Sequence, residues 1–138
     1  MRSNAETIRA RAFRLACAVV AVALQIRPVP GVRSVIEQLV RAAPSVGANL
    51  EEAKAASTRR EFIRFVEISL REARETHYWL RIAIAVKLAP VTTLQPLLEE
   101  SDQLIRILTV IVLNTKRRGV AGVAVSAFCI LNSALLIS

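Results

Sequence analysis

The sequence predicts an all-α protein, an antiparallel up-and-down four-helix bundle. Aromatic residues make up 4% of the 138 residues and glycines number 4, whereas alanine, leucine, valine, isoleucine and arginine dominate. This composition favours helices over sheets. Breaks with proline, glycine or a helix-capping residue separate four long stretches. Short connections between long helices are typical of antiparallel bundles, and the length suits one domain.

The first two helices are expected over residues 4–26 and 34–56. Two prolines and a glycine in the segment 27–31 end the first helix, because proline and glycine do not continue a helical turn well. Ser34 followed three residues later by Glu37 has the spacing of a capping box, which predicts the start of the second helix.

The third helix is expected to begin after Ser57 as its N-cap and to run to about residue 89, where Pro90 follows. Thr92 or Thr93 is the expected cap of the fourth helix, which ends near residue 118. Gly119 is then placed as the residue that follows the helix end.

An uncharged apolar tail, residues 119–138, is expected to follow a bundle of residues 1–118. The length of the tail and the three cations before it fit a membrane anchor, but it also holds two glycines, three serines and an asparagine. Packing against the bundle or a neighbouring subunit is the favoured interpretation; membrane insertion and disorder are the alternatives. Two cysteines give no disulfide framework, which points to a cytoplasmic protein.

Positive charge is concentrated on one face of the third helix. The net charge is +8, and arginine accounts for most of the cations, so the surface attracts polyanions and suits phosphate contacts. At 100° per residue, five arginines fall within an arc of about 100° along about 30 Å of helix. We call these five residues the arginine stripe: Arg60, Arg64, Arg71, Arg74 and Arg81.

Two interpretations of the stripe remain open at the level of sequence. It is a candidate track for RNA or DNA, bound through phosphates. It is equally consistent with a solvent-exposed face on which Glu67–Arg71 and Arg71–Glu75 form ion pairs between residues four positions apart. Each such pair contributes about a few tenths of a kcal/mol to helix stability.

Polar residues line a second face of the helix predicted over 34–56, among them the small Ser45 and Asn49 and also Glu52. Serine and asparagine permit close helix approach but need hydrogen bonds when buried. This face is therefore expected to form a subunit interface or a polar network within the bundle, with a free surface as the alternative.

No arrangement of residues indicates catalysis, a metal or a cofactor. His77 is the single histidine and lies at the apolar stripe of its helix, where a structural role is expected. No glutamate precedes it by three residues, as a di-metal bundle requires, and no glycine-rich phosphate loop follows a strand. We expect a protein that is not an enzyme.

Two sequence blocks resemble the bacterial four-helix-bundle family of 23S rRNA intervening-sequence proteins. The first is RAAPSVGANLEEA over residues 41–53, and the second ends in ISLREARETHYWL over residues 68–80. The resemblance implies that the chain forms a ring-shaped homopentamer. A related branch of the family, the accessory variability determinant of diversity-generating retroelements, binds nucleic acid and a reverse transcriptase, so the resemblance also implies these two kinds of partner. Residues that match these blocks are expected in the interface or polar network: Ser45, Asn49, Glu52, Glu72, Glu75, Tyr78 and Trp79.

The expected function is that of a non-enzymatic oligomeric scaffold that binds RNA or DNA without sequence preference through its arginine stripe. A homo-oligomer is expected, a pentamer by resemblance. The alternatives are a protein-interaction adaptor without nucleic-acid binding and a bundle tethered to a membrane by residues 119–138.

Overall fold

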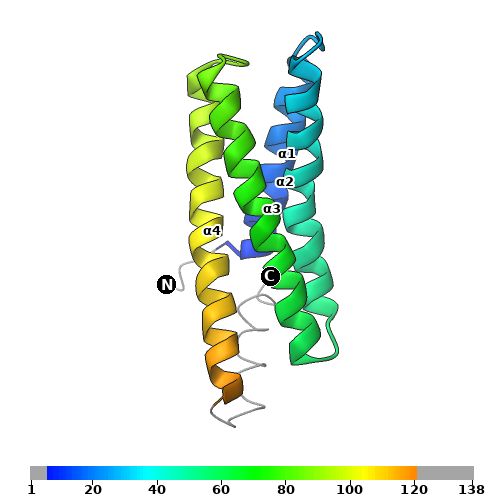
Figure 1. Cartoon of the computed structure of the whole chain (residues 1–138), viewed down its shortest axis with the longest axis vertical. Helices are drawn as coiled ribbons and strands as arrows, with labels where there is room; N and C mark the ends of the chain where they lie inside the picture. The colour runs from blue at the N-terminus through cyan, green and yellow to red at the C-terminus, as the bar shows by residue number, and fades with distance from the viewer. Residues whose placement is uncertain (1–5, 121–138) are drawn as a thin grey trace.

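The fold is an up-and-down bundle of four helices, α1 (Ile8–Gln25), α2 (Val32–Ala55), α3 (Arg59–Ala85) and α4 (Val91–Val120). The computed structural model describes residues 6–120. Successive helices run in opposite directions, with the α1–α2 and α3–α4 connections at the upper end in Figure 1. The predicted fold class is confirmed. The ring-shaped assembly stays a prediction.

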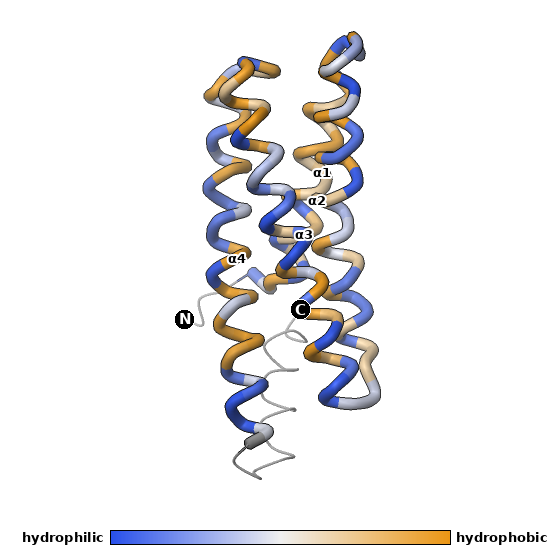
Figure 2. Tube along the Cα trace, in the orientation of Figure 1, coloured by the Kyte–Doolittle hydropathy of each residue, from blue (hydrophilic) through white to orange (hydrophobic). Residues whose placement is uncertain are grey.

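Neighbouring helices in the chain are neighbours in space. α2 packs on α1 and α3, α3 packs on α4, and a smaller contact between α1 and α4 closes the bundle. Apolar and polar residues alternate along each helix (Figure 2), as expected when one face of every helix turns inward.

Leucine and valine fill most of the core, and buried alanines lie between them. Phe62 is 1% exposed and is the largest fully buried side chain of the described residues. On α3 the buried positions include Thr76, whereas His77 is only partly buried, because Thr76 takes the core position at this turn. The alanines that are buried among the helices are Ala12, Ala42, Ala43, Ala53, Ala56, Ala73 and Ala83.

The capping box predicted at the start of the second helix is wrong. Gly31 caps α2 with a φ of 85° and no side-chain hydrogen bond, and the Arg33 amide already donates to the Val29 carbonyl at 3.0 Å. A glycine adopts this left-handed conformation at little cost. Helical hydrogen bonding therefore begins before Ser34, which lies inside the first turn.

Thr58, and not Ser57, caps α3. The Thr58 hydroxyl accepts from the Glu61 amide at 3.1 Å, while the Glu61 carboxylate accepts from the Ser57 amide at 2.9 Å. The helix ends at Ala85, earlier than predicted, and Lys87 then adopts a φ of 55°. The sequence placed a capping residue correctly to within one position.

Both predicted ends of the fourth helix also shift. α4 begins at Val91, directly after Pro90, whose carbonyl accepts from the Thr93 amide at 2.9 Å, so neither threonine precedes the helix. α4 continues through Gly119 to Val120, and Gly119 does not follow the helix end. From residue 121 onward the predicted tail lies outside the described residues. No described helix combines the length and apolarity needed to cross a membrane.

Replacing Gly47 by alanine is expected to stabilise the protein by about 0.5–1 kcal/mol, because glycine lowers helix stability by that amount. A Cβ atom at Gly47 would lie 3.7 Å from its nearest neighbour, which is ordinary contact. Thermal unfolding measures the gain. Gly31→Ala is the matched control and should destabilise, because its φ of 85° strains any side chain. A Gly47→Ala variant less stable than the wild type would contradict this account.

A bidentate ion pair connects α1 to α4. Arg11 Nε and Nη2 donate to the two Glu100 carboxylate oxygens at 2.8 and 2.9 Å. The hydrogen bond from Arg11 lowers the pKa of Glu100 below its ordinary value of 4.5. The pair thus stabilises the fold fully above this unfolded-state value, and its contribution is lost as the pH falls through the lowered folded-state pKa.

Glu100→Gln is expected to cost about 1–3 kcal/mol at pH 7, because a charged hydrogen-bond partner of a half-buried guanidinium is lost. The difference from wild type should shrink on acidification, as the wild-type carboxyl becomes neutral too. Urea unfolding at pH 7 and pH 3 measures both effects. Glu51→Gln, in a pair with Arg9 whose glutamate is 60% exposed, should change stability by less than about 0.5 kcal/mol. Equal losses at both pH values would contradict the assignment.

Candidate nucleic-acid interface

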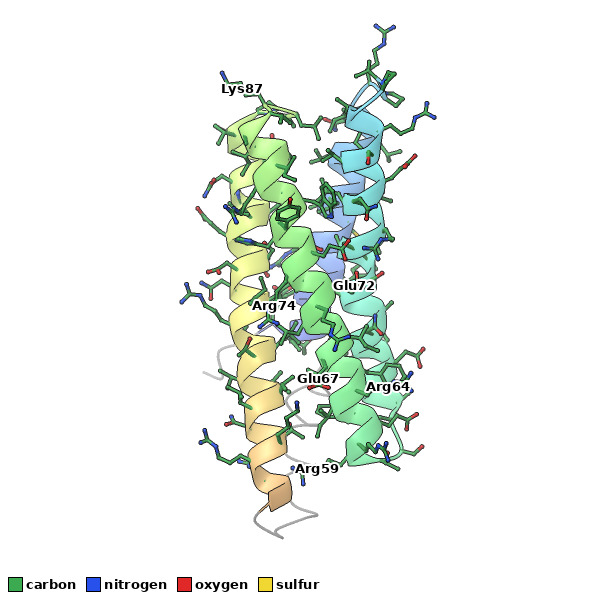
Figure 3. All side chains as sticks on the ribbon, in the orientation of Figure 1. Arg59, Arg64, Glu67, Glu72, Arg74 and Lys87 are labelled. Atoms are coloured by element: carbon green, nitrogen blue, oxygen red, sulfur yellow. The ribbon has the colours of Figure 1, made fainter. Side chains whose placement is uncertain are left out.

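The arginine stripe lies on the outer face of α3. All five arginines are exposed, and Figure 3 shows Arg64, Glu67 and Arg74 along the side of α3 turned to the viewer. Among the residues that the structure describes, no hydrogen bond or ion pair engages any of the five guanidinium groups. The stripe is therefore a row of positive charges that no ion pair within the described part of the chain neutralises.

The glutamates beside the stripe form their ion pairs with residues of other helices. Glu67 accepts from Lys116 of α4 at 2.5 Å, and Glu75 forms an ion pair with Arg41 of α2. The pairs Glu67–Arg71 and Arg71–Glu75, on which the solvated-face interpretation depended, are not formed. Lys116 and Arg41 on the adjacent helices pair with these carboxylates, so neither glutamate forms an ion pair with a stripe arginine.

A polar cluster joins α2 to α3 beside the stripe. Arg41 contacts Glu72 at 3.4 Å as well as Glu75, and the Trp79 indole donates to Glu75 at 3.4 Å. The hydrogen bond from Arg41 lowers the pKa of Glu75, and the same bond raises the pKa of Arg41. Tyr78 packs edge-to-face on Trp79, with ring centres 5.3 Å apart. Two of the predicted network residues, Glu72 and Glu75, thus contact Arg41, and Trp79 joins them through Glu75.

The other predicted network residues do not join this cluster. Ser45 and Asn49 donate to the carbonyls of Arg41 and Ser45, one turn earlier on their own helix, at 2.7 and 2.8 Å. Glu52 is exposed and makes no hydrogen bond or ion pair with the described residues. Close helix packing instead uses Ser69, whose buried hydroxyl donates to the Val46 carbonyl at 2.8 Å.

Sequence reasoning missed two cations, Arg41 and Arg59. Arg41 was visible on the polar face of its helix, but its partners stand 31 and 34 positions away in the chain. Arg59 lies beside the stripe at the lower end of α3 (Figure 3), with its guanidinium 2.8 Å from where a Cβ atom of Gly119 would stand. Its Nη2 atom is buried without a hydrogen-bond partner among the described residues. It adds a sixth positive charge beside an open hollow of about 590 Å³ that Arg60 and Arg64 also line.

An apolar groove of about 570 Å³ lies between α1 and α2, away from the stripe. Phe13 and Leu24 line it and are 70% and 82% exposed, the highest values among the large apolar side chains described. Gly47 and Ala48 of α2 form part of the opposite wall. Apolar surface of this kind marks contact with another molecule more often than free solvent.

Within residues 6–120, no three histidine, cysteine or acidic side chains gather closely enough to hold a metal ion. His77 lies half-buried on α3, and Cys17 is an exposed free thiol in the apolar groove. Neither residue is part of a catalytic arrangement with another described side chain.

These features define a class: a basic all-α helical bundle with one arginine-rich face. The chain belongs to the 23S rRNA-intervening sequence protein family, whose sequence model matches residues 6–110. It is similar to the crystal structure, at 1.70 Å resolution, of a protein of unknown function from the S23 ribosomal protein family of Bacteroides thetaiotaomicron. That likeness has a TM-score of 0.69 and 25% identity, over 76% of this chain and 97% of the other. A comparison with curated proteins gives no match.

Proposed function

We propose that this protein is a non-enzymatic cytoplasmic scaffold that binds RNA or DNA through phosphate contacts along the arginine stripe. One observation carries the proposal: within residues 6–120, none of the five exposed guanidinium groups on this helix face forms an ion pair, while Glu67 and Glu75 pair with Lys116 and Arg41. A row of fixed cations about 30 Å long attracts a polyanion in preference to a single small anion.

The binding is expected to be independent of sequence. Guanidinium groups on an exposed helix face contact phosphates, which all nucleotides share, and phosphate contacts carry no sequence information directly. The net charge of +8 strengthens the long-range attraction. The scaffold therefore recognises the backbone and its charge density.

Association into a homo-oligomeric ring is part of the proposal. The α1–α2 groove is the best-suited described surface for a second copy of the chain, because Phe13 and Leu24 expose apolar area there. This groove and the stripe lie on different helices, so assembly leaves the arginines of each copy free. Several stripes in one particle would bind one long nucleic acid more tightly than a single stripe does.

The test of binding is a salt series with fluorescently labelled oligonucleotides. If the stripe contacts phosphates, the logarithm of the affinity should fall linearly with the logarithm of the salt concentration, with a slope of about −0.9 per phosphate contact on duplex DNA. Heparin should compete. Absence of binding at about 50 mM salt, where a slope of this kind gives the highest affinity, would overturn the proposal and favour the adaptor.

The test of assembly is light scattering after size-exclusion chromatography in high salt. The wild type should elute as one oligomer, and Leu24→Glu should give smaller species, because a charge in an apolar contact costs several kcal/mol unless paired. Arg27→Glu, on the exposed α1–α2 connection, is the matched control and should leave the assembly intact. A wild-type monomer, or an unchanged Leu24→Glu oligomer, would remove the groove from the proposal.

A further inference from the structure

A hollow of about 400 Å³ lies on the seam between α3 and α4, near the α3–α4 connection. Tyr78, Arg81 and Gln95 contribute its aromatic and polar lining, and its apolar lining includes the half-buried Ile82, Ile84 and Leu98. The volume falls in the range of small-ligand sites, which combine an apolar surface with a few polar groups. Two of its residues, Tyr78 and Arg81, lie on the same face of α3 as the stripe.

The aromatic ring in this hollow is exposed and yet held in place. Tyr78 is 54% exposed, and its ring meets the Trp79 ring at an interplanar angle of 73°. Trp79 is anchored by its hydrogen bond to Glu75, which in turn pairs with Arg41 of α2. A ring fixed in this way loses little conformational entropy when another aromatic molecule stacks on it.

Two cations that form no ion pair with any described residue flank Tyr78 along α3. Arg74 lies four residues before it and Arg81 three residues after it, so the two are separated by about 10 Å along the helix axis. Glu75, the carboxylate that follows Arg74 in the chain, is paired with Arg41. The arrangement therefore offers one stacking surface between two phosphate-binding groups.

We infer that this hollow binds an unpaired nucleobase of a single-stranded nucleic acid, stacked on Tyr78, with Arg74 and Arg81 on the flanking phosphates. The inference rests on the proposed function, because the arginine stripe supplies the backbone contacts that lead to the hollow. A base in a duplex has its two faces covered by its neighbours, so a duplex reaches the arginines but not the ring. Single strands thus gain a contact that duplexes lack, and base–aromatic stacking is tolerant of sequence.

The experiment compares three labelled ligands with equal numbers of phosphates per strand: a single-stranded 20-mer, its duplex, and a single strand with abasic residues throughout. Fluorescence anisotropy measures each affinity for wild type, Tyr78→Ala and Tyr78→Phe. Tyr78→Ala should weaken binding of the normal single strand by about 5- to 100-fold. It should leave the duplex and the abasic strand within about twofold, and Tyr78→Phe, which keeps the ring, should bind like wild type.

Two results would overturn the inference while leaving the proposed function intact. One is an unchanged affinity of Tyr78→Ala for the single strand. The other is an equal loss on all three ligands, which would indicate a change in the stripe. Absence of wild-type binding to every ligand would overturn both proposals. Thermal unfolding of Tyr78→Ala checks that this variant is folded. Tyr78→Leu keeps the bulk of the side chain without an aromatic face, and it should also lose affinity for the normal single strand alone.

Discussion

Reversing two charges in the middle of the stripe, Arg64→Glu with Arg71→Glu, is expected to weaken nucleic-acid binding by about 100-fold or more at low salt. Each substitution removes an attraction of about 1 kcal/mol at contact in water and adds a repulsion of similar size. The salt slope on duplex DNA should also become shallower by about 1.8, because two phosphate contacts are lost. Affinity measured from 50 to 200 mM salt tests both effects.

The matched control is Arg27→Glu with Arg33→Glu. It changes the net charge by the same amount, and both arginines are exposed around the α1–α2 connection, outside α3. We expect less than about a threefold loss, because surface charges farther apart than a Debye length of about 10 Å interact weakly. Equal losses in the two double variants would mean that net charge alone attracts the ligand and that the stripe is not a site.

The number of helices and the face that carries the arginines could be predicted from sequence because both depend on local periodicity. The angular position of Arg60 or Arg81 on α3 follows from 100° per residue once the helix is recognised. The exposed placement of all five arginines agrees with that calculation. The caps were harder, since Gly31 adopts its positive φ where the chain turns between two packed helices.

The partners of the charged residues could not be predicted in this way. Spacing alone pairs Arg71 with Glu67 or Glu75, whereas the fold brings Lys116 and Arg41 to these glutamates from neighbouring helices. The relative rotation of two packed helices decides such contacts, and no spacing within one helix encodes it. The same holds for the hollow beside Tyr78, which needs α4 to supply Gln95 and Leu98.

The polar cluster around Arg41 connects the packing of α2 on α3 with the exposed face of α3. Arg41 of α2 pairs with Glu75 of α3, so this glutamate forms its ion pair across the two helices and not with Arg71 of its own helix. The same glutamate holds Trp79, which supports Tyr78. Residues that resemble the two family blocks therefore have a structural role at the contact between α2 and α3.

Phe62→Ala is expected to cost about 3–5 kcal/mol, the largest stability loss of any substitution discussed. Phe62 lies in the first turn of α3 and is 1% exposed, so truncating its ring leaves a cavity in the core. Against a typical total of about 5–15 kcal/mol, the variant should unfold at a temperature about 10–20 °C lower. Calorimetry or circular dichroism measures this shift.

Tyr78→Ala is the matched control, because it removes an aromatic ring from the same helix at a position that is 54% exposed. Its loss should stay near 1 kcal/mol, the contribution of the edge-to-face contact with Trp79. Burial is the main difference between the two substitutions. Similar losses in both would mean that the Phe62 site collapses around alanine and that little cavity remains.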